Sequence, residues 1–179
     1  MQTCNRQVMK FAYNITMISF RKYFIAILML LTLASVEANS VKEQPKLPLE
    51  IALPKLQSIK HAAITFGTGP TQAYVFIDPY CPRSQDFLAL IHESQKMRSL
   101  YTYHFFLYEL PRFNTAALIE DIYSQKDAKK ALIDVMINHK KIPKVKSLMK
   151  KKIAAIAKIA HELNVYKRPY LILNKKRKH

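Results

Sequence analysis

One short run of the sequence combines a nucleophile with residues that begin a helix: Cys81-Pro82-Arg83-Ser84. Pro82 suits the first turn of a helix, where its missing N–H would have no partner. We therefore expect Cys81 to stand at a helix N-terminus, where unpaired N–H groups and the helix dipole favour the thiolate over the thiol. Arg83 adds a neighbouring positive charge. Because the thiolate is the nucleophile, Cys81 is the candidate catalytic residue.

The fourth position of this run decides which thiol chemistry is open. A second cysteine there would complete a redox-active CxxC motif, but the residue is Ser84. We expect the Ser84 hydroxyl to donate a hydrogen bond to the thiolate. The alternative interpretation is that Cys81 is only a small apolar residue that happens to begin a helix.

Other chemistry finds little support in the residues. Of the six histidines, only His92 lies near the expected helix of Cys81, and eleven residues of helix separate the two by about three turns. A Cys–His protease pair is therefore not expected. The chain has no P-loop and no GxGxxG motif, and we expect no cofactor and no metal.

The charge of the chain is strongly positive. Lys and Arg number 29 against 12 Asp and Glu, a formal charge of +17. Such an excess suits nucleic acid, a membrane surface or acidic proteins, but it also describes a basic solvated surface. We interpret the lysine-rich stretch 140–152 as a solvated face and expect no nucleic-acid partner.

The N-terminus has the pattern of an export signal. Two basic residues precede an apolar run of about eleven residues, 23–33, which is shorter than the roughly 20 residues that span a bilayer. Small residues at Val36 and Ala38 place cleavage after Ala38. An uncleaved membrane anchor is the alternative. Cleavage would remove Cys4 and leave Cys81 as the only cysteine, unable to form an internal disulfide.

The remaining chain alternates between strand and helix patterns. Residues 39–58 are polar and proline-bearing and are interpreted as a linker or short N-terminal segment, with a short helix beginning near Leu56 and an edge strand after it. The expected strands are 72–78, 100–110 and 169–173, and the expected helices are 82–97, 114–123, 127–138 and 148–163. This alternation predicts an α/β domain over 59–179.

Several of these segments resemble periplasmic thiol:disulfide interchange proteins of the DsbC/DsbG type, which have a thioredoxin-like fold. The strand 74–77 runs to Asp78, three residues before Cys81, as in that family. Segments 122–136 and 159–173 are similar to the family's helical insertion and to its proline-bearing last part. The resemblance covers about residues 60–175. It implies a thioredoxin-like fold with a helical insertion, and a cis peptide bond before Pro169 that brings this proline beside Cys81.

The chain departs from that family at three points. Ser84 replaces the second active-site cysteine, and Arg168 stands where a small or β-branched residue precedes the cis-proline. The sequence ends a few residues after the last expected strand, where the family continues with a further strand and helix. We expect one sheet edge to be uncovered and available to a partner chain.

Two functions remain open from the residues and the resemblance. The first is a monothiol disulfide isomerase or thiol–disulfide oxidoreductase of the periplasm, acting on exported proteins with cysteines or disulfides. Its catalytic group would be Cys81, Ser84 and Pro169, and its substrate-binding residues Pro82, Arg83 and Arg168. The second is a non-enzymatic thioredoxin-like component of an envelope, secretion or conjugation apparatus.

Overall fold

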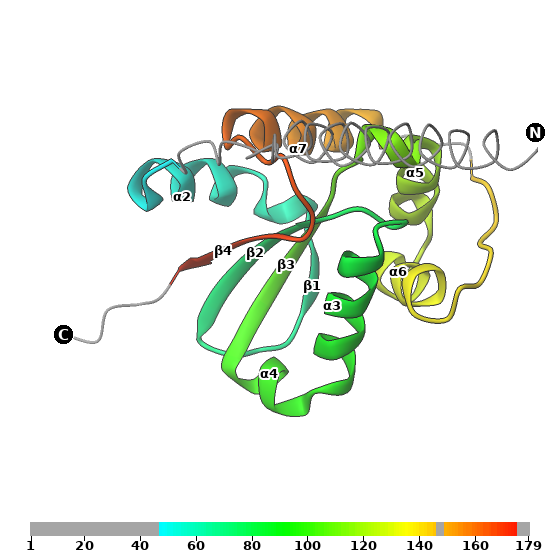
Figure 1. Ribbon diagram of the computed structural model, residues 1–179, viewed down its shortest axis with the longest axis horizontal. Coiled ribbons are helices and arrows are strands. Elements are labelled where there is room, and N and C mark those ends of the chain that lie inside the picture. Colours follow the sequence, from blue (N-terminus) through cyan, green and yellow to red (C-terminus); the bar gives the residue numbers. More distant parts are fainter. Residues whose placement is uncertain (1–46, 146–148, 175–179) are drawn as a thin grey trace, which may run out of the picture. The chain divides into compact units, whose positions relative to one another are not determined.

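The computed structural model describes residues 47–145 and 149–174 (Figure 1). The expected signal peptide 1–38 and the basic end of the chain lie outside the described residues. In chain order the elements are α2 (Leu49–Ser58), η1 (Lys60–Ala62), β1 (Ile64–Phe66), β2 (Thr71–Ile77), α3 (Pro82–Glu93), α4 (Gln95–Leu100), β3 (Tyr101–Leu107), η2 (Pro111–Phe113), α5 (Ala116–Ser124), α6 (Ala128–Met136), α7 (Lys150–Glu162) and β4 (Tyr170–Asn174).

The strands form one mixed four-stranded sheet in the order β1-β3-β2-β4. The central strands β2 and β3 are parallel, with Ile77 opposite Leu107 at their carboxyl ends. The outer strands run the other way: β1 is antiparallel to β3, and β4 is antiparallel to β2. The segments that follow β2 and β3 therefore leave the sheet at the same edge, which in open α/β sheets is where ligands bind.

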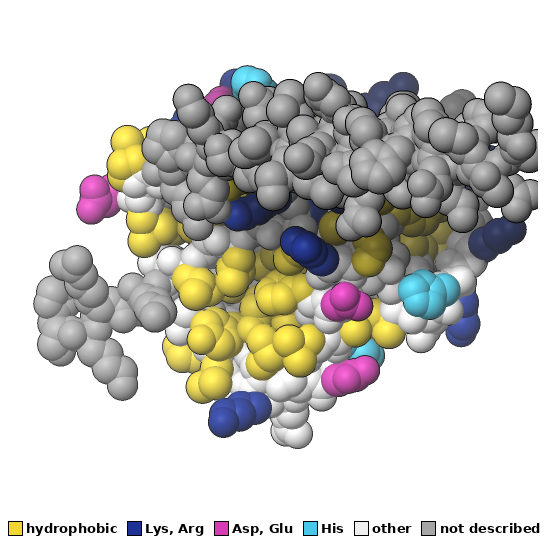
Figure 2. Space-filling model, viewed as in Figure 1, with side chains coloured by type: hydrophobic (Ala, Val, Ile, Leu, Met, Phe, Trp, Pro, Cys, Tyr) yellow, Lys and Arg dark blue, Asp and Glu magenta, His cyan; other side chains and the backbone are white. Residues whose placement is uncertain are grey.

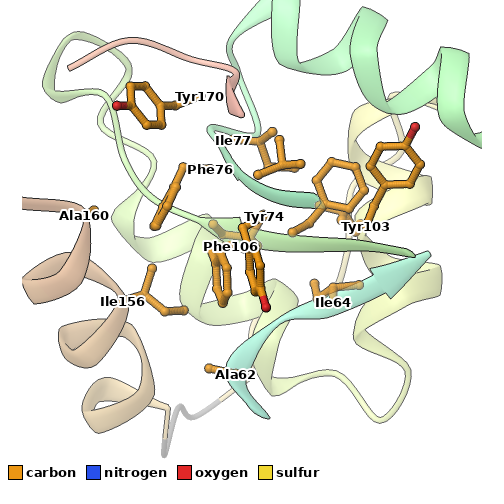
Figure 3. Packing of buried hydrophobic residues seen from close by; sticks show 14 of the residues in the cluster. Ala62, Ile64, Tyr74, Phe76, Ile77, Tyr103, Phe106, Ile156, Ala160 and Tyr170 are labelled. Carbon is orange, nitrogen blue, oxygen red and sulfur yellow. The ribbon is translucent and has the colours of Figure 1, made fainter. Parts of the chain in front are cut away.

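Strand residues alternate between two packed faces of the sheet. On one face Phe76 and Phe106 lie with ring centroids 5.2 Å apart, and Figure 3 shows Ile156 and Ala160 of α7 directed toward this pair. On the other face Phe87 of α3 meets the rings of Tyr103 and Phe105 edge-on. The helices α7 and α3 thus cover opposite faces.

The helix α2 begins earlier than the sequence indicates, at Leu49 and not near Leu56. Pro54 sits inside it, and the three prolines of segment 39–58 were the reason for expecting less helix there. Ala52 and Leu56 are buried in the core, and an ion pair joins Lys55 to Glu162 of α7. Burial of one apolar side offsets the poor local propensity of this segment.

The expected helix 82–97 is divided in two. The hydroxyl of Ser94 accepts a hydrogen bond from the Met97 N–H at 3.2 Å and begins α4. The helical spacing of the apolar residues Phe87, Leu88, Leu90 and Ile91 predicts that all four face inward, but only Leu88 and Ile91 are fully buried, and Leu90 is 53% exposed. The other expected helices and strands are present with ends shifted by a few residues.

The turn between β1 and β2 holds the only two glycines of the chain. Gly67 has a φ of +79°, and a Cβ there would lie 2.3 Å from the carbonyl oxygen of Tyr101. A Cβ on Gly69 would lie 2.1 Å from the backbone of Leu100. Both positions therefore require glycine for the turn to lie against the start of β3.

Within the described residues, no helix is long and apolar enough to cross a membrane. The same part of the chain has no group of three His, Cys, Asp or Glu side chains placed to hold a metal ion.

A buried histidine lies in the middle of the sheet. The Nε2 atom of His104 is 2.7 Å from Gln72 Oε1, and its Nδ1 is 3.4 Å from Thr65 Oγ1. The ring lies 5.2 Å from that of Tyr74. Burial, and secondarily the charge of Lys60, lowers the pKa of His104 to about 4. The neutral imidazole is therefore part of the native structure.

The low pKa of His104 predicts a loss of stability in mild acid. In the unfolded chain this histidine has a pKa near 6.5. Between about pH 6.5 and 4 the unfolded state therefore binds a proton at this residue, whereas the native state does not. The free energy of unfolding should fall by up to about 1.4 kcal/mol per pH unit through this window. Urea unfolding of wild type and His104→Gln from pH 7.5 to 4.5 measures it. If both chains lose stability in parallel, His104 is not the group responsible.

Candidate functional site

The turn after β2 places Cys81 at the first position before α3. The Cys81 N–H donates to the Asp78 carbonyl at 3.1 Å, and the Cys81 carbonyl accepts from the N–H groups of Ser84 and Gln85 at 2.9 and 3.0 Å. Pro82 occupies the first helical position, as the sequence predicts. The cysteine side chain therefore starts from the N-terminal end of a twelve-residue helix, where the dipole favours a negative charge.

The loop between α7 and β4 lies against this cysteine. The Arg168–Pro169 peptide bond is cis, and Cys81 Sγ is 3.8 Å from the Arg168 carbonyl oxygen. Strand pairing explains the proximity: Tyr170 is opposite Phe76, so the residues just before β4 reach the end of β2. The structure thus brings the regions of Cys81 and Pro169 together.

The side chain of Arg168 turns into the protein. Its Nε donates to the Tyr108 carbonyl at 3.0 Å and its Nη2 to the Glu109 carbonyl at 3.1 Å. Its Nη1 donates to the carbonyls of Val165 and Lys167 at 3.1 and 3.0 Å. These bonds join the loop after β3 to the loop before β4, so the guanidinium holds the walls of the site in place.

The same guanidinium is a buried positive charge near the thiol. Burial lowers the pKa of Arg168 to about 10, and Tyr108, Asp78 and Cys81 oppose this shift as neighbouring groups. Since this pKa remains well above neutral, Arg168 is charged under ordinary conditions. This positive charge lies near the side chain of Cys81, at the N-terminal end of α3.

Ser84 lies beneath the turn and is fully buried. Its Oγ accepts a hydrogen bond from the Asp78 N–H at 3.4 Å. Within the described residues it forms no hydrogen bond to Cys81 Sγ. The expected bond from the hydroxyl to the sulfur is therefore not seen in this structure.

The carboxylate of Asp78 joins three segments around the site. Its Oδ1 accepts from the Tyr80 N–H at 2.8 Å, and its Oδ2 accepts from the Leu110 N–H at 2.6 Å and the Thr115 hydroxyl at 2.9 Å. Both Asp78 and Thr115 are fully buried. This side chain fixes the cysteine turn, the loop after β3 and the start of α5 relative to one another.

A groove of about 690 Å³ opens beside the cysteine. It lies between the first turn of α3, the loop after β3 and the loop before β4. Its described lining residues are Cys81, Pro82, Arg83, Leu110, Pro111, Arg112, Tyr166, Lys167 and Arg168. Of the six site residues expected from the sequence, four line the groove, while Ser84 lies beneath the turn and Pro169 follows directly on Arg168.

Sequence reasoning did not find Asp78 as the residue that joins the segments, nor the groove residues 110–112. The position of residues 110–112 beside Cys81 could have been predicted from the sequence. Both 78–81 and 108–112 directly follow strands that are parallel neighbours, and the carboxyl ends of such strands meet at one edge. The hydrogen bonds of the Asp78 carboxylate to Leu110 and Thr115 have no comparable signal, because these partners are 32 and 37 residues away along the chain.

Comparison with known proteins shows the fold. No protein-family model matches the chain, and no curated protein matches its sequence. The structure resembles that of a disulfide interchange protein from Neisseria gonorrhoeae, with 23% identity and a TM-score of 0.50 over 63% of this chain and 80% of the other. It also resembles Proteus mirabilis ScsC in a compact conformation, with 14% identity and a TM-score of 0.52 over 96% and 88% of the two chains. The fold is thioredoxin-like, in agreement with the resemblance seen in the sequence.

The three hydrogen bonds that the Asp78 carboxylate accepts predict that its replacement lowers the stability of the protein. In Asp78→Asn an NH2 group replaces one carboxylate oxygen. This NH2 group would face N–H or O–H donors, so at least one of these buried donors loses its acceptor. We expect a loss of about 2–4 kcal/mol in the free energy of unfolding. Thr115→Val removes a single donor and should cost about 1 kcal/mol.

Urea unfolding of both variants measures these losses. The Asp78→Asn variant combined with Thr115→Val should lose less than the sum of the two, because the substitutions share one bond. Additive losses in the free energy of unfolding would contradict the hydrogen bond between Thr115 and Asp78.

Proposed function

We propose that this chain is an exported monothiol catalyst of thiol–disulfide exchange. The observation that carries the proposal is the position of Cys81: it directly precedes α3, its Sγ lies 3.8 Å from the Arg168 carbonyl oxygen, and it lines an open groove. The thioredoxin-like fold and the likeness to a disulfide interchange protein support it.

In the first step the Cys81 thiolate attacks one sulfur of a substrate disulfide. The Sγ–S bond forms as the substrate S–S bond breaks, and the electron pair leaves with the other substrate sulfur, which takes a proton from solvent. The products are a mixed disulfide and one free substrate thiol. Taken together, Cys81 and the substrate have undergone no net oxidation or reduction.

Release of the mixed disulfide requires a second thiol from outside the site. Ser84 stands at the position of a resolving cysteine and has no sulfur to attack with. A second thiolate of the substrate can attack its own sulfur in the mixed disulfide, which isomerises the substrate and frees Cys81. Alternatively, an external thiol attacks the Cys81 sulfur of the mixed disulfide, so the substrate leaves as a thiol and the external thiol remains bound to Cys81. A second external thiol then attacks this disulfide, which frees Cys81 and yields the disulfide of the two external thiols.

We assign a cleaved signal peptide to 1–38, a short N-terminal segment to 39–58, whose helix α2 packs on the core, and the thioredoxin-like domain to 59–179. The domain then acts in the periplasm on envelope proteins with cysteines or disulfides. The N-terminal residue of the protein recovered from its native envelope tests the cleavage: it should be Asn39, whereas an intact N-terminus would indicate a membrane anchor.

A second candidate is a binding or assembly component without thiol chemistry. The observation that favours it is the outer edge of β4, which within the described residues pairs with β2 alone. Leu171 on this strand is 42% exposed, and Figure 2 shows hydrophobic side chains gathered over the strands of the sheet. A partner chain at this edge would be detected as a change in molar mass by light scattering, lost in Leu171→Lys.

The exchange proposal predicts that activity depends on one sulfur. Wild type should accelerate the refolding of a scrambled multi-disulfide protein, and Cys81→Ser should abolish the acceleration. Extracts made without reductant should contain mixed disulfides of the wild type that disappear in the variant. Equal refolding rates for both chains, with no mixed disulfides, would favour the binding component.

A matched variant separates isomerisation from oxidation. Wild type should not oxidise a reduced dithiol peptide, because net oxidation requires a disulfide that cycles between two cysteines. Ser84→Cys places a second sulfur one helical turn away and should confer this oxidation in the presence of an external disulfide.

A further inference from the structure

The groove beside Cys81 is lined by positive charges from separate segments. Arg83 comes from the first turn of α3, Arg112 from η2, and Lys167 and Arg168 from the loop before β4. No acidic residue occurs among the described residues that line it. The groove is therefore an electropositive surface next to the nucleophile.

Two of these cations are placed to meet a ligand. Arg83 and Arg112 are exposed, and neither forms an ion pair with a carboxylate of the described residues. The guanidinium carbon of Arg112 lies 4.7 Å above the ring of Phe113, which limits its freedom. Arg168, in contrast, donates to backbone carbonyls and is only 6% exposed.

The carboxylates on the loops that flank the groove, Asp78 and Glu109, form no ion pair with Arg83 or Arg112. The oxygens of Asp78 accept bonds from Tyr80, Leu110 and Thr115 inside the protein. Glu109 Oε1 accepts from the Ala116 N–H at 3.3 Å, on the start of α5. The groove between Pro82, Leu110 and Tyr166 therefore combines apolar walls with the exposed guanidinium groups of Arg83 and Arg112.

We propose that this groove selects substrate segments with acidic residues on either side of the reacting cysteine. The inference rests on the exchange function proposed above and adds its substrate class. Carboxylates that flank the substrate sulfur would reach Arg83 on one wall and Arg112 on the other, so the sulfur is held over Cys81. Charge complementarity of this kind raises the association rate and rejects segments of the wrong sign.

The overall positive charge of the chain would attract any acidic peptide, so the test needs a control of equal charge. Arg83→Gln/Arg112→Gln removes two charges from the groove. Lys96→Gln/Lys151→Gln removes two charges from exposed lysines that do not line it. Both variants have the same net charge, and any difference between them is local.

The probes are three seven-residue peptides with a central cysteine flanked on each side by two Glu, two Gln or two Lys. Each is prepared as a mixed disulfide with 5-thio-2-nitrobenzoate, whose release during attack by Cys81 is followed by absorbance. In low salt the Glu peptide should react about 10-fold faster than the Lys peptide, with the Gln peptide between them. The Arg83→Gln/Arg112→Gln chain should lose most of this ratio, and the Lys96→Gln/Lys151→Gln chain should keep it.

A second measurement is independent of thiol chemistry. The same peptides with Ser in place of Cys, carrying a fluorophore, are titrated with Cys81→Ser protein, and binding is followed by anisotropy. The Glu peptide should bind more tightly than the Lys peptide, and the groove variant should weaken this binding more than the control.

The outcomes distinguish the two proposals. Selective binding without release of thionitrobenzoate would leave the groove inference intact and overturn the exchange function. Release at equal rates from all three peptides would support exchange and overturn the groove inference. Equal loss of selectivity in both double variants would also overturn it, because the preference would then come from net charge.

Discussion

The buried carboxylate of Asp78 is the interaction on which the geometry of the site depends. It follows β2 directly and accepts hydrogen bonds from the cysteine turn, from the loop after β3 and from the residue before α5. A buried carboxylate has a favourable energy only when its oxygens are satisfied, so the three segments are held at the distances that its bonds require. The groove walls and the position of Cys81 follow from this arrangement.

The pairing of the strands also determines the geometry of the site, because it brings its loops together. The parallel pairing of β2 with β3 brings two loops to one edge, and the antiparallel pairing of β4 with β2 brings the end of the 164–169 loop to the same place. Arg168 then fastens the loops to each other through backbone carbonyls. The buried guanidinium of Arg168 is thus accommodated by the carbonyl acceptors that the neighbouring loop provides.

Periodicity and turn residues in the sequence predicted most of the fold. The strands 71–77 and 101–107 have the β-branched and aromatic composition of buried strands, and Pro82 and Asp127 indicated two helix starts correctly. The extent of α2 was missed, because its prolines are local signals of a break and its stability comes from burial of Leu56 in the core. For the candidate site, Cys81 could be proposed from the sequence because the signal for its chemistry is local. The roles of Asp78 and of the Arg168 side chain could not be, since each depends on backbone groups distant in the chain.

The proposed exchange function makes particular demands on the site because residue 84 is a serine. In this structure Ser84 Oγ accepts a hydrogen bond from the Asp78 N–H in the turn that presents Cys81, and under the proposed function it offers no sulfur that could resolve a mixed disulfide. Without such a route, an adduct persists until another thiol reaches it. The cost of capturing an unsuitable substrate is therefore greater for a one-cysteine site than for a two-cysteine site. Discrimination before the covalent step is correspondingly more important, and among the described residues the surface placed to provide it is the charged groove that Cys81 lines.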